Sequence, residues 1–175
     1  MSDYLFKVML AGGGRYKTAI LKRFTTGHFK SDTKITIGVD FATHDVVLPD
    51  IGSATLQLWD FELQERHLKL LPLFVSGSSG ALIFFDFDQP QTFDELHTLV
   101  PIIRENTRNI PIILCGTNWD ETIPEYVITE AADILQFIER NKIQEFHKVD
   151  GKTGHNVDLM FNRITQLMIE AKWKV

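Results

Sequence analysis

The sequence predicts an open α/β sheet that is mostly parallel, has one antiparallel strand and carries helices on both faces. Predicted strands and helices alternate along nearly the whole chain, which is typical of strands joined by crossover helices. The exception is a pair of strands at Phe41–Leu48 and Thr55–Trp59, which the turn residues 49–52 join as a hairpin. A chain of 175 residues is long enough for one domain, residues 1–175, with a sizeable core.

The other strands follow from apolar runs. Tyr4–Leu10 is a mostly apolar strand, and Phe146–Val149 predicts a short one near the end of the chain. Gly80–Phe85 and Pro111–Cys115 are continuously apolar, which is typical of strands buried on both faces. We therefore expect Cys115 to be a buried core thiol.

Helical spacing predicts helices at Thr18–Thr26, Gln64–Phe74, Thr92–Asn106, Thr129–Asn141 and Asn156–Lys172. The second is expected to be short and irregular, with Pro72 near its end. A capping box, Thr92–Glu95, is expected to open the third, and Asn156 to cap the last. The residues expected to face inward on the last two helices are Ala132, Leu135, Phe137 and Ile138, then Leu159, Ile164, Leu167 and Met168.

Composition narrows the class of protein. The formal net charge is −5 and no basic stripe is present, which argues against a nucleic-acid-binding surface. A single cysteine excludes a disulfide framework and fits a reducing compartment. The sequence shows no signal peptide, no glycine after Met1 for myristoylation and no apolar run of membrane-spanning length. We expect a cytoplasmic location.

The stretch from Lys7 to Ile20 indicates a phosphate-binding loop, since a buried strand leads through Gly12–Gly14 into Lys17 and Thr18. Glycines allow backbone N–H groups to surround an anion, a lysine adds charge at the outer phosphates, and a threonine hydroxyl can bind Mg²⁺. The pattern G-x-x-x-x-G-K-[ST] is broken by Ala11 and Tyr16. On this pattern alone, the stretch could equally be a glycine-rich turn that binds no ligand.

In open α/β sheets, ligands bind beyond the carboxyl ends of the strands. The site is therefore expected after Leu10, Trp59, Asp86, Cys115 and Val149. Several of the polar candidates lie at these positions.

Several stretches carry a resemblance to a known family: Tyr4–Val8, Thr36–Phe41, Leu56–Asp60 with Gln64–Arg66, Pro111–Leu114, and Lys152–Gly154 with Asn156–Val157. Thr36 also follows Lys17 by nineteen residues, the family distance from the loop lysine to the switch threonine. The sequence resembles the Ras-like small GTPases over essentially its whole length, and the Rab branch most closely. The resemblance implies a three-layer G domain with a six-stranded sheet that binds GTP or GDP with Mg²⁺.

The resemblance also implies roles for individual residues. Thr18 and Thr36 would bind Mg²⁺ directly and Asp60 through water. Lys17 would hold the β- and γ-phosphates and Gln64 would orient the attacking water, so these two are the catalytic candidates. The expected nucleotide contacts are Gly12, Gly13, Gly14, Arg15, Tyr16, Lys17, Thr18, Ala19, Phe29, Thr36, Leu63, Asn118, Asp120, Gly151 and Lys152.

At the base, Asp120 would accept from the guanine ring N–H and exocyclic amine. Gly151 would offer a backbone N–H to the guanine carbonyl, and Phe29 would lie against the base. Near the switch segments, an aromatic triad of Phe41, Trp59 and Phe74 would bind partner proteins.

The sequence departs from the family pattern at several of these positions. Tyr16 and Leu63 replace glycines, Thr117-Asn118 stands where Asn-Lys is expected, and Asp150–Lys152 replaces Ser-Ala-Lys. Arg15 could add charge near the phosphates or face solvent. Losing one or two hydrogen bonds to the base would cost about 1–3 kcal/mol, or about one to two decades of affinity. We expect nucleotide binding with slow or impaired hydrolysis.

Three functional readings follow. The first is a Mg²⁺-dependent GTP/GDP switch. The second is a pseudo-GTPase, a nucleotide-independent interaction module, for which the best evidence is that the Tyr16 ring could fill the phosphate site. The third is a switch with relaxed base choice. The switch would be a monomer whose effectors and regulators bind its switch regions. Since Ala171–Val175 lacks prenylated cysteines, membrane association would require a partner or a missing tail.

Overall fold

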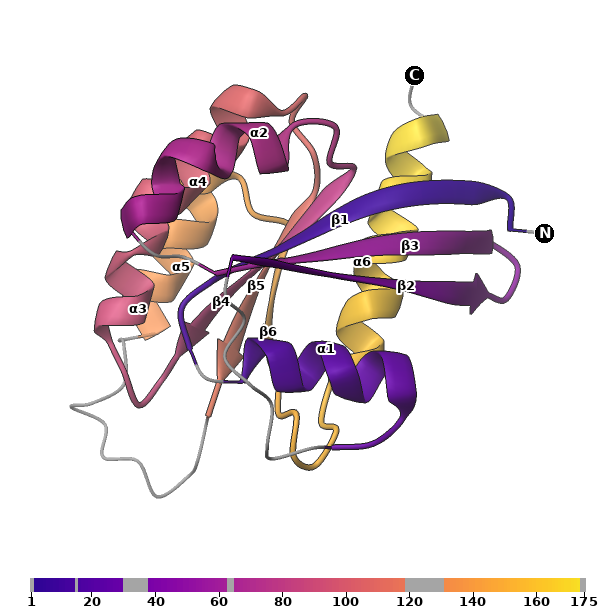
Figure 1. Ribbon diagram of the computed structural model, residues 1–175, viewed down its shortest axis with the longest axis horizontal. Helices are drawn as coiled ribbons and strands as arrows, with labels where there is room; N and C mark the ends of the chain where they lie inside the picture. Colours follow the sequence, from indigo (N-terminus) through magenta and orange to yellow (C-terminus); the bar gives the residue numbers. More distant parts are fainter. Residues whose placement is uncertain (1, 15, 30–37, 63–64, 119–130, 174–175) are drawn as a thin grey trace.

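The computed structural model describes residues 2–14, 16–29, 38–62, 65–118 and 131–173 (Figure 1). Five of the predicted site residues lie outside these ranges. They are Arg15, Thr36, Leu63, Gln64 and Asp120.

A six-stranded sheet forms the middle layer, in the order β2-β3-β1-β4-β5-β6. Its strands are β1 (Tyr4–Gly12), β2 (Val39–Leu48), β3 (Gly52–Phe61), β4 (Gly80–Asp86), β5 (Ile112–Thr117) and β6 (Glu145–Lys148). Only the β2–β3 pair is antiparallel, and all other neighbours are parallel. The predicted fold class and hairpin are therefore confirmed.

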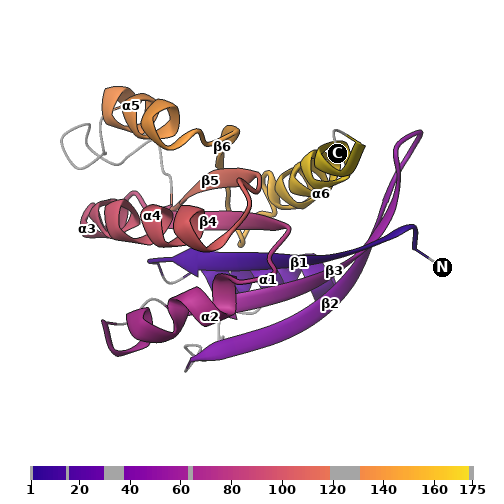
Figure 2. The same ribbon diagram turned by 90° about the horizontal axis from the view of Figure 1, so that it is seen from above.

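The helices lie in two outer layers (Figures 1 and 2). They are α1 (Lys17–Thr26), a 3-10 helix η1 (Glu65–Leu70), α2 (Leu71–Val75), α3 (Gln91–Asp94), α4 (Leu96–Asn106), α5 (Ala131–Asn141) and α6 (Val157–Trp173). The irregular helix predicted after residue 64 is the 3-10 turn followed by α2. Within the described ranges, no helix combines the length and the apolar character that crossing a membrane needs.

Two hydrophobic clusters hold the layers together, one on each face of the sheet. Because successive side chains of a strand point to opposite faces, Phe6, Val8 and Leu10 pack on the side of α1 and α6. Met9 and Ala11 belong to the cluster on the side of α2, α4 and α5. Cys115 lies fully buried in the first cluster, as predicted, and burial raises the pKa of its thiol.

The predicted capping box at Thr92–Glu95 is wrong. Pro90 is the N-cap of α3, and the helix breaks at Glu95 before α4 begins. Thr92 is buried, and its hydroxyl donates to the Gln89 carbonyl at 2.7 Å and accepts the Asp86 N–H at 2.8 Å. These bonds use the hydroxyl to fix the turn after β4, since local hydrogen bonds from a side chain to the backbone compete with helix capping.

Three predicted inward-facing positions are also wrong. Ala132, Leu135 and Leu159 are exposed, with Leu159 keeping 51% of its surface accessible. The buried faces are instead formed by Ile134 and Phe137 on α5 and by the residues Met160, Phe161, Ile164 and Met168 on α6. Asn156 directly precedes α6, and its carbonyl accepts the Met160 N–H at 3.0 Å.

We expect Phe161→Ala to lower the free energy of unfolding by about 3–5 kcal/mol. Phe161 is fully buried, and its ring stacks on that of Phe24 with the centroids 3.8 Å apart. Leu159→Ala, two residues earlier on the exposed face of the same helix, should change stability by about 0.5 kcal/mol or less. Urea denaturation measures both, and equal losses would contradict the assigned orientation of α6.

Candidate functional site

The glycine run between β1 and α1 is packed closely against the carboxyl end of β4. Gly12 has φ of 110°, and a Cβ there would lie 2.2 Å from the Phe84 carbonyl oxygen, so no side chain fits. A Cβ on Gly13 would lie 2.7 Å from the Thr92 methyl carbon. Gly14, also at φ of 110°, adjoins Asp86. Glycine is therefore required here so that the loop backbone can approach the end of the sheet.

Lys17 and Thr18, the first residues of α1, converge on Asp60 at the end of β3. The Lys17 Nζ lies 2.9 Å from Asp60 Oδ1 and also donates to the Phe61 carbonyl. The Thr18 hydroxyl donates to Asp60 Oδ2 at 2.8 Å. Lys17 is 5% exposed and Asp60 is fully buried. Buried charges require such partners, since an isolated one would lose its hydration without compensation.

The topology of the sheet explains this convergence. β1 is paired with β3 on one side and β4 on the other, and Leu10 lies opposite Asp60 in the register. The chain leaving β1 therefore enters α1 beside the end of β3. Two predicted metal ligands, Thr18 and Asp60, and the predicted phosphate lysine are brought together at the expected edge of the sheet.

The Tyr16 ring packs against the hydrophobic cluster on the α1 and α6 side of the sheet. Tyr16 is partly buried and precedes α1, where its carbonyl accepts the Ile20 N–H at 2.8 Å. The best evidence for the pseudo-GTPase hypothesis was that this ring could fill the phosphate site. Packing of the ring on the core lends that hypothesis no support.

The residues predicted to contact a base are spread over three segments. Phe29 is half-buried after α1, and Asn118 follows β5 with φ of 57°. Gly151 is buried against α1, where an added Cβ would lie 3.0 Å from Ile20 Cγ1, whereas Lys152 is exposed. Ala19 is buried in the core, so its side chain is fixed by packing within α1.

The three rings of the predicted aromatic triad take part in two separate contacts, one between Phe41 and Trp59 and one between Phe74 and Phe61. The Phe41 and Trp59 rings, on paired positions of β2 and β3, meet edge to face with centroids 5.4 Å apart. Phe41 is 50% exposed, as a docking residue would be. Phe74 on α2 packs on Phe61, with the ring centroids 5.4 Å apart.

Lys7 and Glu95 are two charged residues near these sites that sequence reasoning missed. The Lys7 Nζ lies 4.6 Å from the Trp59 ring centroid and donates to the Ser76 carbonyl at 2.9 Å. Desolvation lowers the pKa of Lys7. The Glu95 carboxylate approaches Gly13, and burial raises its pKa. Lys7 could have been noticed in the sequence because it is a charged residue within the apolar strand β1. The sequence gives no such indication that Glu95 lies near Gly13.

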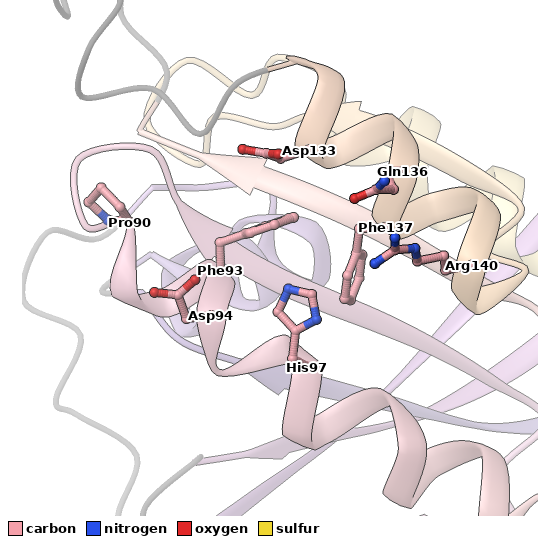
Figure 3. Close-up of a pocket in the computed structure, with 8 residues that line it drawn as sticks. All are labelled: Pro90, Phe93, Asp94, His97, Asp133, Gln136, Phe137 and Arg140. Carbon is pink, nitrogen blue, oxygen red and sulfur yellow. The ribbon is translucent and has the colours of Figure 1, made fainter.

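A hollow of about 280 Å³ lies between α3, α4 and α5 (Figure 3). The rings of Phe93, His97 and Phe137 contact one another at its wall. Charged and polar side chains complete the lining, namely Asp94, Asp133, Gln136 and Arg140, together with Pro90. None of these residues belongs to the predicted nucleotide site, which lies at the ends of β1 and β3.

Comparison with known proteins identifies the class to which this fold and site belong. Residues 7–170 match the Ras family, and the chain belongs to that family. It is 34% identical over 168 residues to Ras-related protein Rab-11A of Dictyostelium discoideum, covering 94% of this chain and 77% of that protein. It is 35% identical over 164 residues to GTP-binding protein ypt3 of Schizosaccharomyces pombe, covering 93% and 75%.

A plant relative, Ras-related protein RABA1c of Arabidopsis thaliana, is 32% identical over 164 residues, covering 93% of this chain and 74% of that protein. The resemblance to the Rab branch, first seen in short stretches, therefore extends over most of the chain. Membership in this family supports a small GTP-binding protein.

We expect Lys17 and Asp60 to be energetically coupled in the ligand-free protein. Asp60→Ala should cost about 3–5 kcal/mol, because it leaves a buried ammonium group without its carboxylate. Adding Lys17→Met to Asp60→Ala should recover part of that loss, giving a coupling energy of about 1–3 kcal/mol. Urea denaturation of the two single variants and the double variant measures this, and additive losses would contradict the pairing.

Proposed function

We propose that the chain is a GTP/GDP switch whose nucleotide binding depends on Mg²⁺ and whose intrinsic hydrolysis is slow. The observation that carries this proposal is the meeting of Lys17, Thr18 and Asp60 beside the glycine run. A cation, a hydroxyl and a carboxylate are the groups that a magnesium-bound triphosphate needs. Glycines next to them allow the loop backbone to approach the phosphates.

The donor set fits Mg²⁺. The Thr18 hydroxyl and the Asp60 carboxylate are hard oxygen ligands 2.8 Å apart, and Mg²⁺ in proteins uses one or two carboxylates together with substrate phosphates. Thr36 is proposed as a further ligand from its family spacing. Thr18, Asp60 and Thr36 would hold the ion, which would supply positive charge that neutralises the phosphate groups.

Lys17 would exchange one anionic partner for another when nucleotide binds. In the structure its ammonium group is paired with Asp60. With a triphosphate bound, the Lys17 ammonium group would donate to phosphate oxygens, and the Asp60 carboxylate would hold the metal through water. Phosphate binding and metal binding would therefore depend on each other.

Slow hydrolysis is proposed from the sequence around the second switch. Gln64 would orient the attacking water, and Leu63 occupies the position of a family glycine whose N–H contacts the γ-phosphate. Leucine keeps the N–H but restricts the backbone conformations that the segment can adopt. Turnover would then depend on an external activating protein.

Guanine selection would rest on Asp120 and on the backbone N–H of Gly151. Without the family's Asn-Lys pair, replaced here by Thr117-Asn118, the base would be held by fewer contacts. Competition between GTP and ATP tests this directly. Retained guanine selection should favour GTP by more than about tenfold, which one good hydrogen bond supports.

The proposed switch would act as a monomer in the cytoplasm. Effector and regulator proteins would bind the switch regions, with Phe41, Trp59 and Phe74 as aromatic contacts. The half-exposed Phe41 ring beside Trp59 supports this surface.

We expect Lys17→Ala to raise the dissociation constant for GTP with Mg²⁺ by at least about thirtyfold. A charged hydrogen bond to phosphate is worth about 2 kcal/mol or more. Lys22→Ala, further along the same helix and partly exposed, should change it by less than about twofold, since it is distant from the glycine run. Isothermal titration calorimetry measures both. If the wild-type protein binds neither GTP nor GDP at millimolar concentration, the proposal fails.

We expect GTP with Mg²⁺ to protect Cys115 from alkylation. The thiol is fully buried, so iodoacetamide can reach it only when the protein opens. A ligand at one hundred times its dissociation constant stabilises the folded state by about 2.7 kcal/mol and should slow labelling about a hundredfold. Equal labelling rates with and without nucleotide would contradict binding, and Lys17→Ala should lose the protection.

A further inference from the structure

Arg23, in the last turn of α1, reaches the loop that follows β6 and donates to three consecutive carbonyls. One guanidinium nitrogen, Nη1, lies 2.8 Å from the Lys152 carbonyl oxygen and 3.3 Å from that of Gly151. The other, Nη2, lies 3.2 Å from the Thr153 carbonyl oxygen. A planar fork of donors suits such a row of acceptors.

Two glycines allow this loop to lie directly on α1. A Cβ on Gly151 would lie 3.0 Å from Ile20 Cγ1 and 3.4 Å from the Ile20 backbone nitrogen. Gly154 has φ of 87°, and a Cβ there would lie 2.7 Å from two nitrogens of the Arg23 guanidinium. The loop backbone therefore contacts both Ile20 and Arg23, one turn apart on the helix.

Asp150 fixes the other side of the same loop. Its Oδ1 accepts the Lys152 N–H at 2.7 Å, and its Oδ2 accepts the Thr153 hydroxyl at 2.8 Å. The Asp150 carbonyl accepts the Gly154 N–H at 2.9 Å. That carbonyl shares a planar peptide unit with the Gly151 N–H, so fixing the carbonyl also fixes the direction of the N–H.

We propose that Arg23 is a positioning residue for guanine recognition. This inference rests on the proposed function, in which the Gly151 N–H meets the guanine ring carbonyl. Arg23 holds the carbonyls of the loop while Asp150 holds its N–H and hydroxyl groups. Because Arg23 and Lys17 belong to one helix, the base-contacting loop is tied to the element that begins at the phosphate site.

The hydrogen bonds from Arg23 to the base-contacting loop are more important in this chain because the family's Asn-Lys pair is absent. Thr117-Asn118 replaces the pair that braces the base in the family, and the Thr117 hydroxyl donates to the Phe85 carbonyl at 3.1 Å. The Arg23 contacts thus fix the position of the Gly151 N–H independently of that brace.

The chain offers a matched control in Arg104 on α4. Arg104 also donates to three carbonyls, at 2.6 Å to Ile110, 3.1 Å to Asn141 and 2.8 Å to Lys142. These acceptors lie before β5 and at the end of α5, and none belongs to the predicted nucleotide site. Arg104→Gln removes an equivalent set of hydrogen bonds from another part of the fold, so it reports the effect of lost stability alone.

The experiment compares Arg23→Gln, Arg23→Lys and Arg104→Gln with the wild-type protein. Dissociation constants are measured for GDP and for 2-aminopurine riboside diphosphate, with Mg²⁺, by competition against a fluorescent guanine nucleotide. The analogue keeps the exocyclic amine, the ribose and both phosphates but lacks the ring carbonyl and, with it, the ring N–H. The missing N–H weakens the analogue equally in every variant, so only the ratios between variants report on the contact of the Gly151 N–H with the carbonyl. Circular dichroism checks that each variant is folded.

We expect Arg23→Gln to weaken GDP about tenfold, the effect of one misplaced hydrogen bond, and the analogue less than about twofold. Arg23→Lys should recover part of the GDP affinity, and Arg104→Gln should leave both ligands unchanged. If Arg23→Gln behaves like Arg104→Gln, or weakens both ligands equally, the inference is overturned while the proposed switch stands. If the wild-type protein binds no GDP, the proposed function fails and this inference fails with it.

Discussion

The buried pair of Lys17 and Asp60 is the interaction on which the arrangement of the site depends. It joins the first residue of α1 to the end of β3, two elements separated by more than forty residues of chain (residues 17 and 60). A charge at this depth is tolerable only beside its counter-charge. The pair therefore sets where α1 begins, and the glycine run has to connect that point to β1.

The glycine run and the ion pair impose complementary constraints. Gly12 allows the chain to leave β1 against the Phe84 carbonyl, where any side chain would collide. The turn then ends where Lys17 can reach Asp60. Glycine-rich loops can direct successive N–H groups to one place, which is the geometric basis of anion binding by such loops. Glycines in the loop and a lysine at the start of α1 are thus required both by the packing of the fold and by the proposed phosphate binding.

The sheet could be predicted from the sequence because its signals are local and strong. Continuous apolar runs such as Gly80–Phe85 leave little choice other than a buried strand, and the turn at residues 49–52 specifies the hairpin. The edge at which Lys17, Thr18 and Asp60 meet could also be predicted, since ligands of open α/β sheets bind beyond the carboxyl ends of the strands. That these three residues share one site was implied by the family resemblance.

What the sequence could not supply were contacts decided by distant neighbours. Thr92 has the local pattern of a helix cap, yet its side chain is buried against Gly13 of the glycine run, far away in the sequence. Leu159 fits a helical apolar stripe, but the stripe that faces the sheet is rotated towards Phe161 and Ile164. The hydrogen bonds of Arg23 to a loop about 130 residues away have no signature within α1 itself (residues 23 and 153).

The ammonium group of Lys7 over the Trp59 ring adds a positive charge to the apolar, aromatic surface of β2 and β3. Phe41 and Trp59 alone would present a hydrocarbon face, for which association varies little with ionic strength. With a cation seated on the indole, an acidic side chain beside an apolar anchor would be the better complement. If the proposed partners bind this surface, their affinity should therefore be sensitive to screening by salt.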